Sequence, residues 1–262
     1  MAMKFQGGIK LSEYRNTKKL PITFIDRPSV ITLGLDNGHC SLVSAGDYVK
    51  KYEKIVLDED GFTVSSPITG KVLAAEQKYI IIENSYQPEI APPDDEKPST
   101  IEEITFEKLI NYSKKYGVTG TFSGIPLHKK LTEAYGKCER LIVSCVESDP
   151  SSGHVRAMVR LHARELVLGI KIILRAMGIK KAVMALDKKY GEDYDAIKKH
   201  AEEKSGIVPA FISIKYPVGC ERLLLNAIYN TEFSSDTEVW RIGYPVLSAE
   251  TVINLYLALR DG

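Results

Sequence analysis

Residues 141–146 read Leu-Ile-Val-Ser-Cys-Val, and this short, mostly apolar run is where the fold class is decided. An amphipathic stretch from Val155 to Met177 follows it, with apolar residues at helical spacing, and Gly178 closes that stretch. A second apolar run, Ala182 to Leu186, comes next. A strand, a helix and a strand in this order predict two parallel strands joined by a helical crossover.

The same alternation continues on both sides of this unit. Downstream, the sequence predicts a charged helix over about 194–204, a strand over 210–214 and helices over about 221–229 and 249–259. Upstream, Thr100-Ile101-Glu102-Glu103 is a plausible capping box for a helix that runs to about Tyr116. We therefore expect residues 100–262 to form a Rossmann-like α/β domain.

Residues 1–86 have a different sequence pattern, in which short runs of strand-forming residues alternate with residues that favour turns. The stretches 45–51 and 66–72 resemble the two halves of a biotinyl/lipoyl-type barrel-sandwich hybrid. Where such a domain carries its cofactor lysine at a hairpin tip, residues 58–61 read Asp-Glu-Asp-Gly. The sequence therefore predicts a small N-terminal β domain of this lipoyl-like kind with a structural role.

A proline-rich stretch separates the two parts. Residues 85–100 read SYQPEIAPPDDEKPST and contain four of the chain's 12 prolines beside an acidic run. Such a segment has few apolar side chains to bury and favours extended conformations. We assign residues 87–99 as a linker.

Composition excludes several classes of function. The chain of 262 residues has a formal net charge of +1, so its overall charge does not attract nucleic acid. No apolar run approaches the roughly 20 residues that a membrane-spanning helix needs, and the start lacks the apolar core of a signal peptide. The sequence thus predicts a cytoplasmic protein without direct membrane insertion or a nucleic-acid partner.

Metal sites are not indicated either. The four cysteines are widely spread and form no C-x-x-C pair, and the five histidines show no ligand spacing such as H-E-x-x-H. We expect free thiols, and neither a zinc site nor an iron–sulfur cluster in this chain.

Three segments contain candidate ligand-binding residues where an α/β sheet normally binds its ligand. They are a glycine-containing segment over 117–131, a carboxylate-rich loop over 144–150 and a segment over 214–223. Glycines let backbone amides approach an anionic group, and two carboxylates two residues apart can accept hydrogen bonds from one ligand. Each segment also has a plainer interpretation: a turn, a solvated loop with a helix cap, and a simple strand-to-helix connection.

Taken in order, these segments resemble the C subunit of the Rnf electron-transport complex and, more distantly, the NADH-binding flavoprotein subunit of respiratory complex I. Residues 144–150 resemble that family's N-G-A-E-C-E-P string, residues 125–131 its F-P-T-H-V-K-L and residues 215–221 its K-Y-P-S-G-G-E. The opening residues 5–9 are similar to its F-x-G-G-I start. The resemblance spans nearly the whole chain.

The resemblance implies an FMN/NADH-binding-type domain, in which FMN accepts a hydride from NADH and passes electrons singly to an iron–sulfur partner. It implies partner subunits in a membrane redox complex, with the chain peripheral to the membrane. The flavin would supply the chemistry, so no catalytic side chain is implied. The cofactor-binding residues it implies are Gly120, Gly124 and Lys130 in the phosphate loop, Ser144, Glu147 and Asp149 facing the flavin or the nicotinamide nucleotide, and Tyr216, Gly219 and Glu221 closing the pocket.

A departure from the family pattern leaves a second hypothesis open. Where the family has a glycine pair in the phosphate loop, this sequence has Phe122-Ser123. Only glycine permits close backbone approach without a side chain in the way. The alternative is a relative without flavin that acts as a non-catalytic docking or assembly subunit of a redox complex; a different small ligand is a third possibility.

Overall fold

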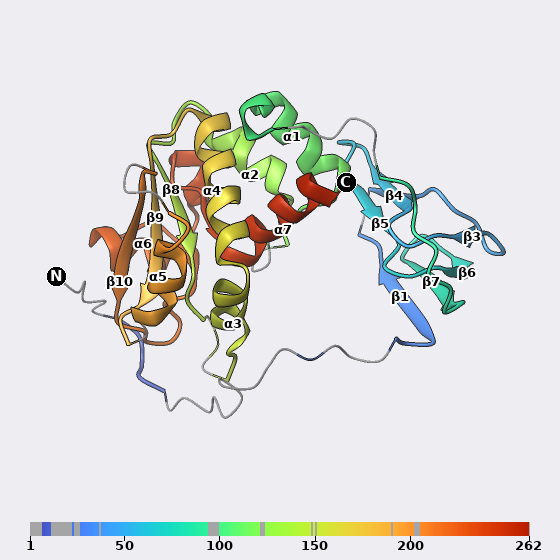
Figure 1. Cartoon of the computed structure of the whole chain (residues 1–262), viewed down its shortest axis with the longest axis horizontal. Helices are drawn as coiled ribbons and strands as arrows, with labels where there is room; N and C mark the ends of the chain where they lie inside the picture. The colour runs from blue at the N-terminus through green and yellow to red at the C-terminus, as the bar shows by residue number, and fades with distance from the viewer. Residues whose placement is uncertain are drawn as a thin grey trace.

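The computed structural model describes residues 7–11, 23, 27–36, 38–93, 100–120, 124–147, 149, 151–189, 191–201 and 205–261. Two small antiparallel sheets come first, and a parallel sheet with helices follows (Figure 1). The prediction of a mixed α/β chain, antiparallel at its N-terminal side and parallel at its C-terminal side, is confirmed at that level.

Seven strands form the N-terminal β domain. One sheet has the order β1-β7-β6-β3 and the other has the order β2-β4-β5. Alternating side chains of these strands enclose a small apolar core that includes Val49, Val72 and Ile82. The strands are β1 (Val30–Gly34), β2 (His39–Ser41), β3 (Tyr48–Val49), β4 (Lys54–Asp58), β5 (Thr63–Ser65), β6 (Gly70–Ala75) and β7 (Tyr79–Asn84).

The described part of the predicted linker lies against the β domain. The backbone N–H of Ala91 donates to the carbonyl of Lys51 at 2.8 Å, and Ile90 forms an isolated bridge with Lys51. The Thr69 hydroxyl donates to the carbonyl of Glu89. Residues 89–91 are therefore held against these strands by hydrogen bonds, whereas residues 94–99 of the predicted linker fall outside the described ranges.

The C-terminal part is built on a parallel sheet of order β10-β9-β8-β11. Its strands are β8 (Arg140–Ser144), β9 (Lys181–Asp187), β10 (Ile207–Ile212) and β11 (Val246–Ser248). Every residue of β8 and β9 after the first is buried, as expected for strands covered on both faces.

Helices connect and cover these strands (Figure 1). In chain order they are η1 (Ile101–Glu103), α1 (Phe106–Lys115), α2 (Leu127–Ala134), α3 (His154–Leu161), α4 (Ala163–Met177), α5 (Gly191–Lys198), α6 (Glu221–Tyr229), η2 (Val239–Ile242) and α7 (Ala249–Asp261).

Several predicted helix boundaries were wrong. The predicted helix over 155–177 is two helices, α3 and α4, which meet at His162 without a glycine or proline, so tertiary packing sets this break. The first helix begins after Thr105, whose side chain accepts from the Lys108 N–H at 3.3 Å, and Thr100 makes no such cap. Helix α5 begins earlier than predicted and ends at Lys198.

Helices α4 and α7 approach each other closely at Gly169. A Cβ atom at this position would lie 2.6 Å from the carbonyl oxygen of Val252 and 2.7 Å from its Cγ1. Only a residue without a side chain fits such a crossing unless the helices move apart.

We expect Gly169→Ala to lower the free energy of unfolding by about 1–3 kcal/mol, because overpacking forces backbone shifts. Urea denaturation measures this loss. The matched control is Gly191→Ala at the start of α5, where an added Cβ meets nothing within 4 Å. That control should be neutral or more stable by up to about 1 kcal/mol. Equal stability of the two variants would contradict the close-crossing argument.

Candidate functional site

The candidate site lies where the strand order of the parallel sheet reverses. From β8 the chain crosses to β9 and then β10 on one side, and it returns to the other side of β8 as β11. In open α/β sheets, ligands bind outside the carboxyl ends of the strands at such a reversal. The carboxyl ends of β8 and β11 are residues Ser144 and Ser248, which are paired in register.

The loop after β8 contributes a buried carboxylate. Glu147 is only 4% exposed, and its Oε1 accepts from the backbone N–H of Arg156 at 3.2 Å, near the start of α3. Glu147 Oε2 and Ser144 Oγ are also buried, and neither has a hydrogen-bond partner in the part of the chain that the structure describes. Buried polar atoms normally have partners, so these two acceptors fit a ligand that offers N–H or O–H groups.

The second predicted carboxylate is placed differently. Asp149 is exposed and accepts from the hydroxyl and, at 2.7 Å, from the backbone N–H of Ser151. These hydrogen bonds to Ser151 lower the pKa of Asp149. The carboxylate therefore stabilises its own turn. Residues 148 and 150 fall outside the described ranges.

A second buried carboxylate at this edge was missed by the sequence analysis. Glu250, in the first turn of α7, is buried, and its Oε2 has no hydrogen-bond partner among the described residues. His154 lies between the two carboxylates, with Nε2 3.0 Å from Glu250 Oε1 and Nδ1 3.9 Å from Glu147 Oε2. Because the short strand β11 (Val246–Ser248) was not predicted, the sequence pattern gave no signal that Glu250 would lie at this edge.

In the predicted glycine-containing segment, here called the glycine loop, the described residues 117–120 and 124–127 pair with each other beside the same edge. Leu127 N–H donates to the Val118 carbonyl at 2.9 Å, Gly120 N–H to Ile125 and Gly124 N–H to Gly120, both at 2.8 Å. The predicted residues Gly120 and Gly124 thus use their amides within the loop. Phe122 and Ser123 lie outside the described residues.

Side-chain hydrogen bonds tie this loop to the carboxyl end of β11. The hydroxyl of Thr251 donates to the carbonyl of Thr119 at 3.2 Å, and its backbone N–H donates to Ser248 Oγ at 3.1 Å. Because Ser248 pairs with Ser144, the glycine loop and the loop after β8 lie at one edge of the sheet.

Two further predicted residues meet each other in a part-buried ion pair, in which the side chain of Lys130 is 2% exposed and that of Glu221 is 19% exposed. The ammonium of Lys130, on α2, contacts the carboxylate of Glu221, the first residue of α6. The Nζ of Lys130 also lies 4.7 Å from the centre of the Trp240 ring. Lys130 and Glu221 are therefore in direct side-chain contact.

The last predicted segment is held by the start of the chain. Tyr216, which precedes a cis proline and is 46% exposed, exchanges two backbone hydrogen bonds with Ile9, at 2.8 and 2.9 Å. Gly219 is buried in the turn before α6. Two segments for which the sequence resembles one family, residues 5–9 and 215–221, are therefore in contact through Ile9 and Tyr216.

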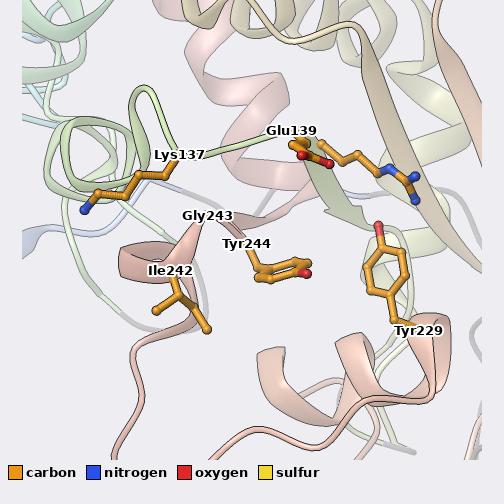
Figure 2. A pocket seen from close by; sticks show the side chains of 7 residues that line it. Lys137, Glu139, Tyr229, Ile242, Gly243 and Tyr244 are labelled. Carbon is orange, nitrogen blue, oxygen red and sulfur yellow. The ribbon is translucent and has the colours of Figure 1, made fainter.

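A cavity of about 390 Å³ lies at the opposite, amino-terminal edge of the sheet (Figure 2). The rings of Tyr229 and Tyr244, 5.9 Å apart, line it. Burial raises the pKa of Tyr229, and Arg140 lies 5.8 Å from the centre of the Tyr229 ring. This cavity is at the far end of β8 from the orphaned carboxylates and does not belong to the same site.

The described residues include no group of three His, Cys, Asp or Glu side chains placed to hold a metal ion. All four cysteines are free. Within the same described part, none of the helices has the length and apolarity required to cross a membrane.

Comparison with known proteins identifies the family of the C-terminal part of the chain. The sequence model of the Nuo51 FMN-binding domain matches residues 113–257, which is more than half of the chain and includes β8, β11 and the glycine loop. The chain belongs to this FMN-binding domain family.

The chain is also similar in sequence to C subunits of ion-translocating oxidoreductase complexes. The C subunit of the ion-translocating oxidoreductase complex of Buchnera aphidicola subsp. Baizongia pistaciae is 24% identical over 230 residues, 84% of this chain and 46% of the relative. The C subunit of the Na(+)-translocating ferredoxin:NAD(+) oxidoreductase complex of Acetobacterium woodii is 23% identical, over 98% of this chain and 62% of the relative. The resemblance to the Rnf C subunit is thus confirmed. The chain spans less than two thirds of these relatives' length.

Solved structures show the same fold. A chain of an NAD+-reducing [NiFe]-hydrogenase in the H2-reduced state has a TM-score of 0.50 and 18% identity to this chain. The match covers 60% of this chain and 31% of the hydrogenase chain. At this identity the likeness supports the α/β architecture of the family domain.

Proposed function

We propose that this chain binds FMN at the crevice between the carboxyl ends of β8 and β11 and serves as an electron-transfer subunit of a ferredoxin:NAD+ oxidoreductase-type complex. Support comes from the family match and from the position of Ser144 and Glu147. Their buried acceptor atoms have no hydrogen-bond partner among the described residues. A flavin ring N–H and ribityl hydroxyls are donors of the kind these atoms need.

In this proposal FMN supplies the redox chemistry, and the side chains of the chain bind and orient it. FMN, when bound, accepts two electrons as a hydride from NADH and releases them one at a time. Glu147 is held by the Arg156 N–H through one oxygen, which leaves its other oxygen to accept from the ligand. Glu250 adds a second buried acceptor, and the His154 ring lies between the two carboxylates. By the resemblance stated above, we propose iron–sulfur clusters of partner subunits as the electron acceptors.

We expect Glu147→Gln to weaken FMN binding about 10- to 100-fold, because a charged acceptor contributes about 1.5–3 kcal/mol to a hydrogen bond. Glutamine keeps an oxygen for the Arg156 N–H and replaces the second acceptor with an NH2 donor. Quenching of FMN fluorescence on titration measures the affinity. The matched control is Asp149→Asn, which alters only an exposed turn and should change the affinity less than about twofold. Similar losses in both variants would contradict this placement of the flavin.

The docking or assembly subunit without flavin remains the second candidate, because particular contacts favour it. Lys130 is bound to Glu221, and the amides of Gly120 and Gly124 donate within their own loop. These contacts leave fewer groups for a phosphate. Absorbance near about 450 nm in the purified chain, or after incubation with FMN, supports the flavoprotein function. A chain that stays colourless after incubation supports the docking function.

A further inference from the structure

The turn between β4 and β5 is stabilised by hydrogen bonds within it. The side chain of Asp58 accepts from the backbone N–H groups of Asp60 at 2.9 Å and Phe62 at 2.7 Å. Gly61 has the left-handed φ of 80° that the turn requires. This is the Asp-Glu-Asp-Gly tip that replaces a cofactor lysine, and we call residues 58–63 the β4–β5 turn.

This turn packs against the N-terminal end of the glycine loop, at Lys115 and Gly117. The hydroxyl of Thr63 donates to the carbonyl of Lys115, at the end of α1, at 2.6 Å. The Thr63 carbonyl lies so close to Gly117 that a Cβ there would be 2.4 Å from its oxygen. Gly117 also has a φ of 62°, so close approach and backbone conformation both require glycine.

The same turn packs against the C-terminal end of the loop, at His128 and Lys129. Phe62 is buried, and its ring centre lies 5.8 Å from that of His128, the second residue of α2. Asp60 forms an ion pair with Lys129 at 2.7 Å. Three residues of the β4–β5 turn, Asp60, Phe62 and Thr63, thus contact both ends of the segment that contains Gly120 and Gly124.

From these contacts we infer that the β4–β5 turn positions the glycine loop for its ligand. The described residues 117–120 and 124–128 pair with each other through the Leu127 to Val118 and Gly120 to Ile125 hydrogen bonds, so contacts that fix Gly117 and His128 also restrict Gly120 and Gly124. Thr251 of α7 holds the loop from its other side through the Thr119 carbonyl. Phe62 and Thr63 are positioning residues that act through this loop, and the ligand in question rests on the proposed function.

Phe62→Ala in the full chain tests the inference by two measurements. We expect hydrogen exchange of the Gly120 and Gly124 amides to accelerate about tenfold or more, because local opening no longer has to break the ring packing. We expect the Kd for FMN to rise by a similar factor. Phe62→Leu, which keeps an apolar side chain in the site, should restore most of both properties.

The matched control separates positioning from simple loss of the β domain. Ile82→Ala removes a buried side chain from the β-domain core without altering the β4–β5 turn, and it should leave exchange in the loop unchanged. If Phe62→Ala does not fold, Thr63→Val removes only the hydroxyl that donates to the carbonyls of Lys115 and Lys114, with an expected acceleration of about threefold.

The outcomes distinguish this inference from the proposed function. Unchanged exchange at Gly120 and Gly124 in Phe62→Ala overturns the positioning role, whatever the flavin affinity. Equal acceleration in Ile82→Ala also overturns it. If the wild-type chain does not bind FMN but exchange still accelerates only in the Phe62 and Thr63 variants, the proposed function fails and the positioning role stands.

Discussion

Lys130→Ala is expected to lower the free energy of unfolding by about 2–4 kcal/mol, because it leaves the carboxylate of Glu221, which is 19% exposed, without its cation. The ammonium of Lys130 is 2% exposed and bound to Glu221, and it also lies over the ring of Trp240. Alanine removes the charge, the cation–π contact and the packing of the aliphatic stem together. Trp240 is the only tryptophan in the sequence, so its fluorescence during urea unfolding reports directly on this region.

The neighbouring residue provides the matched control for this result. Lys129 also has an acidic partner, Asp60, but both side chains are about half exposed. Lys129→Ala should therefore cost at most about 1 kcal/mol. The double variant Lys130→Met/Glu221→Leu should recover much of the lost stability, because it removes both charges. A Lys130→Ala chain as stable as Lys129→Ala would show that the pair of Lys130 and Glu221 does not contribute.

Stability is expected to fall as the pH drops from about 6.5 to about 4, because of His128. Burial is the main cause that lowers the pKa of this imidazole to about 4, and the charges of Lys114 and Lys129 lower it further. In the unfolded chain the group takes up its proton near its usual pKa of 6.5, whereas in the folded chain it remains neutral until about pH 4. The unfolded state binds more protons over this range, so about 3 kcal/mol of stability is lost.

The His128→Leu variant isolates this contribution. It removes the titrating group and places an apolar side chain beside Phe62, so its stability should vary less between pH 7 and pH 4.5 than that of the wild type. Urea midpoints across this range measure the difference. His200→Gln, at an exposed position, should keep the wild-type pH dependence. If the His128 and His200 variants follow the same pH profile, His128 does not titrate as inferred.

Local sequence was enough to predict the order of the main elements. Apolar runs such as 141–146 and 182–186 have to be buried, and the amphipathic stretch between them has the period of a helix, so the parallel β-α-β arrangement follows without any long-range information. The change to short alternating strands before residue 86 is also local, since strand period and turn residues are visible in the sequence itself. The family resemblance then indicated where a ligand site should lie.

Long-range packing decided which of the candidate residues meet. Nothing in the sequence shows that Lys130 lies on Glu221, 91 residues away, or that Glu250 joins Glu147 through His154. The short strand β11 was not predicted, although it creates the reversal of strand order beside β8. The contact of the β4–β5 turn with both ends of the glycine loop is equally invisible to pattern analysis. Such pairings depend on how whole elements fill the space around the sheet, and the local pattern of side chains carries no information about their distant neighbours.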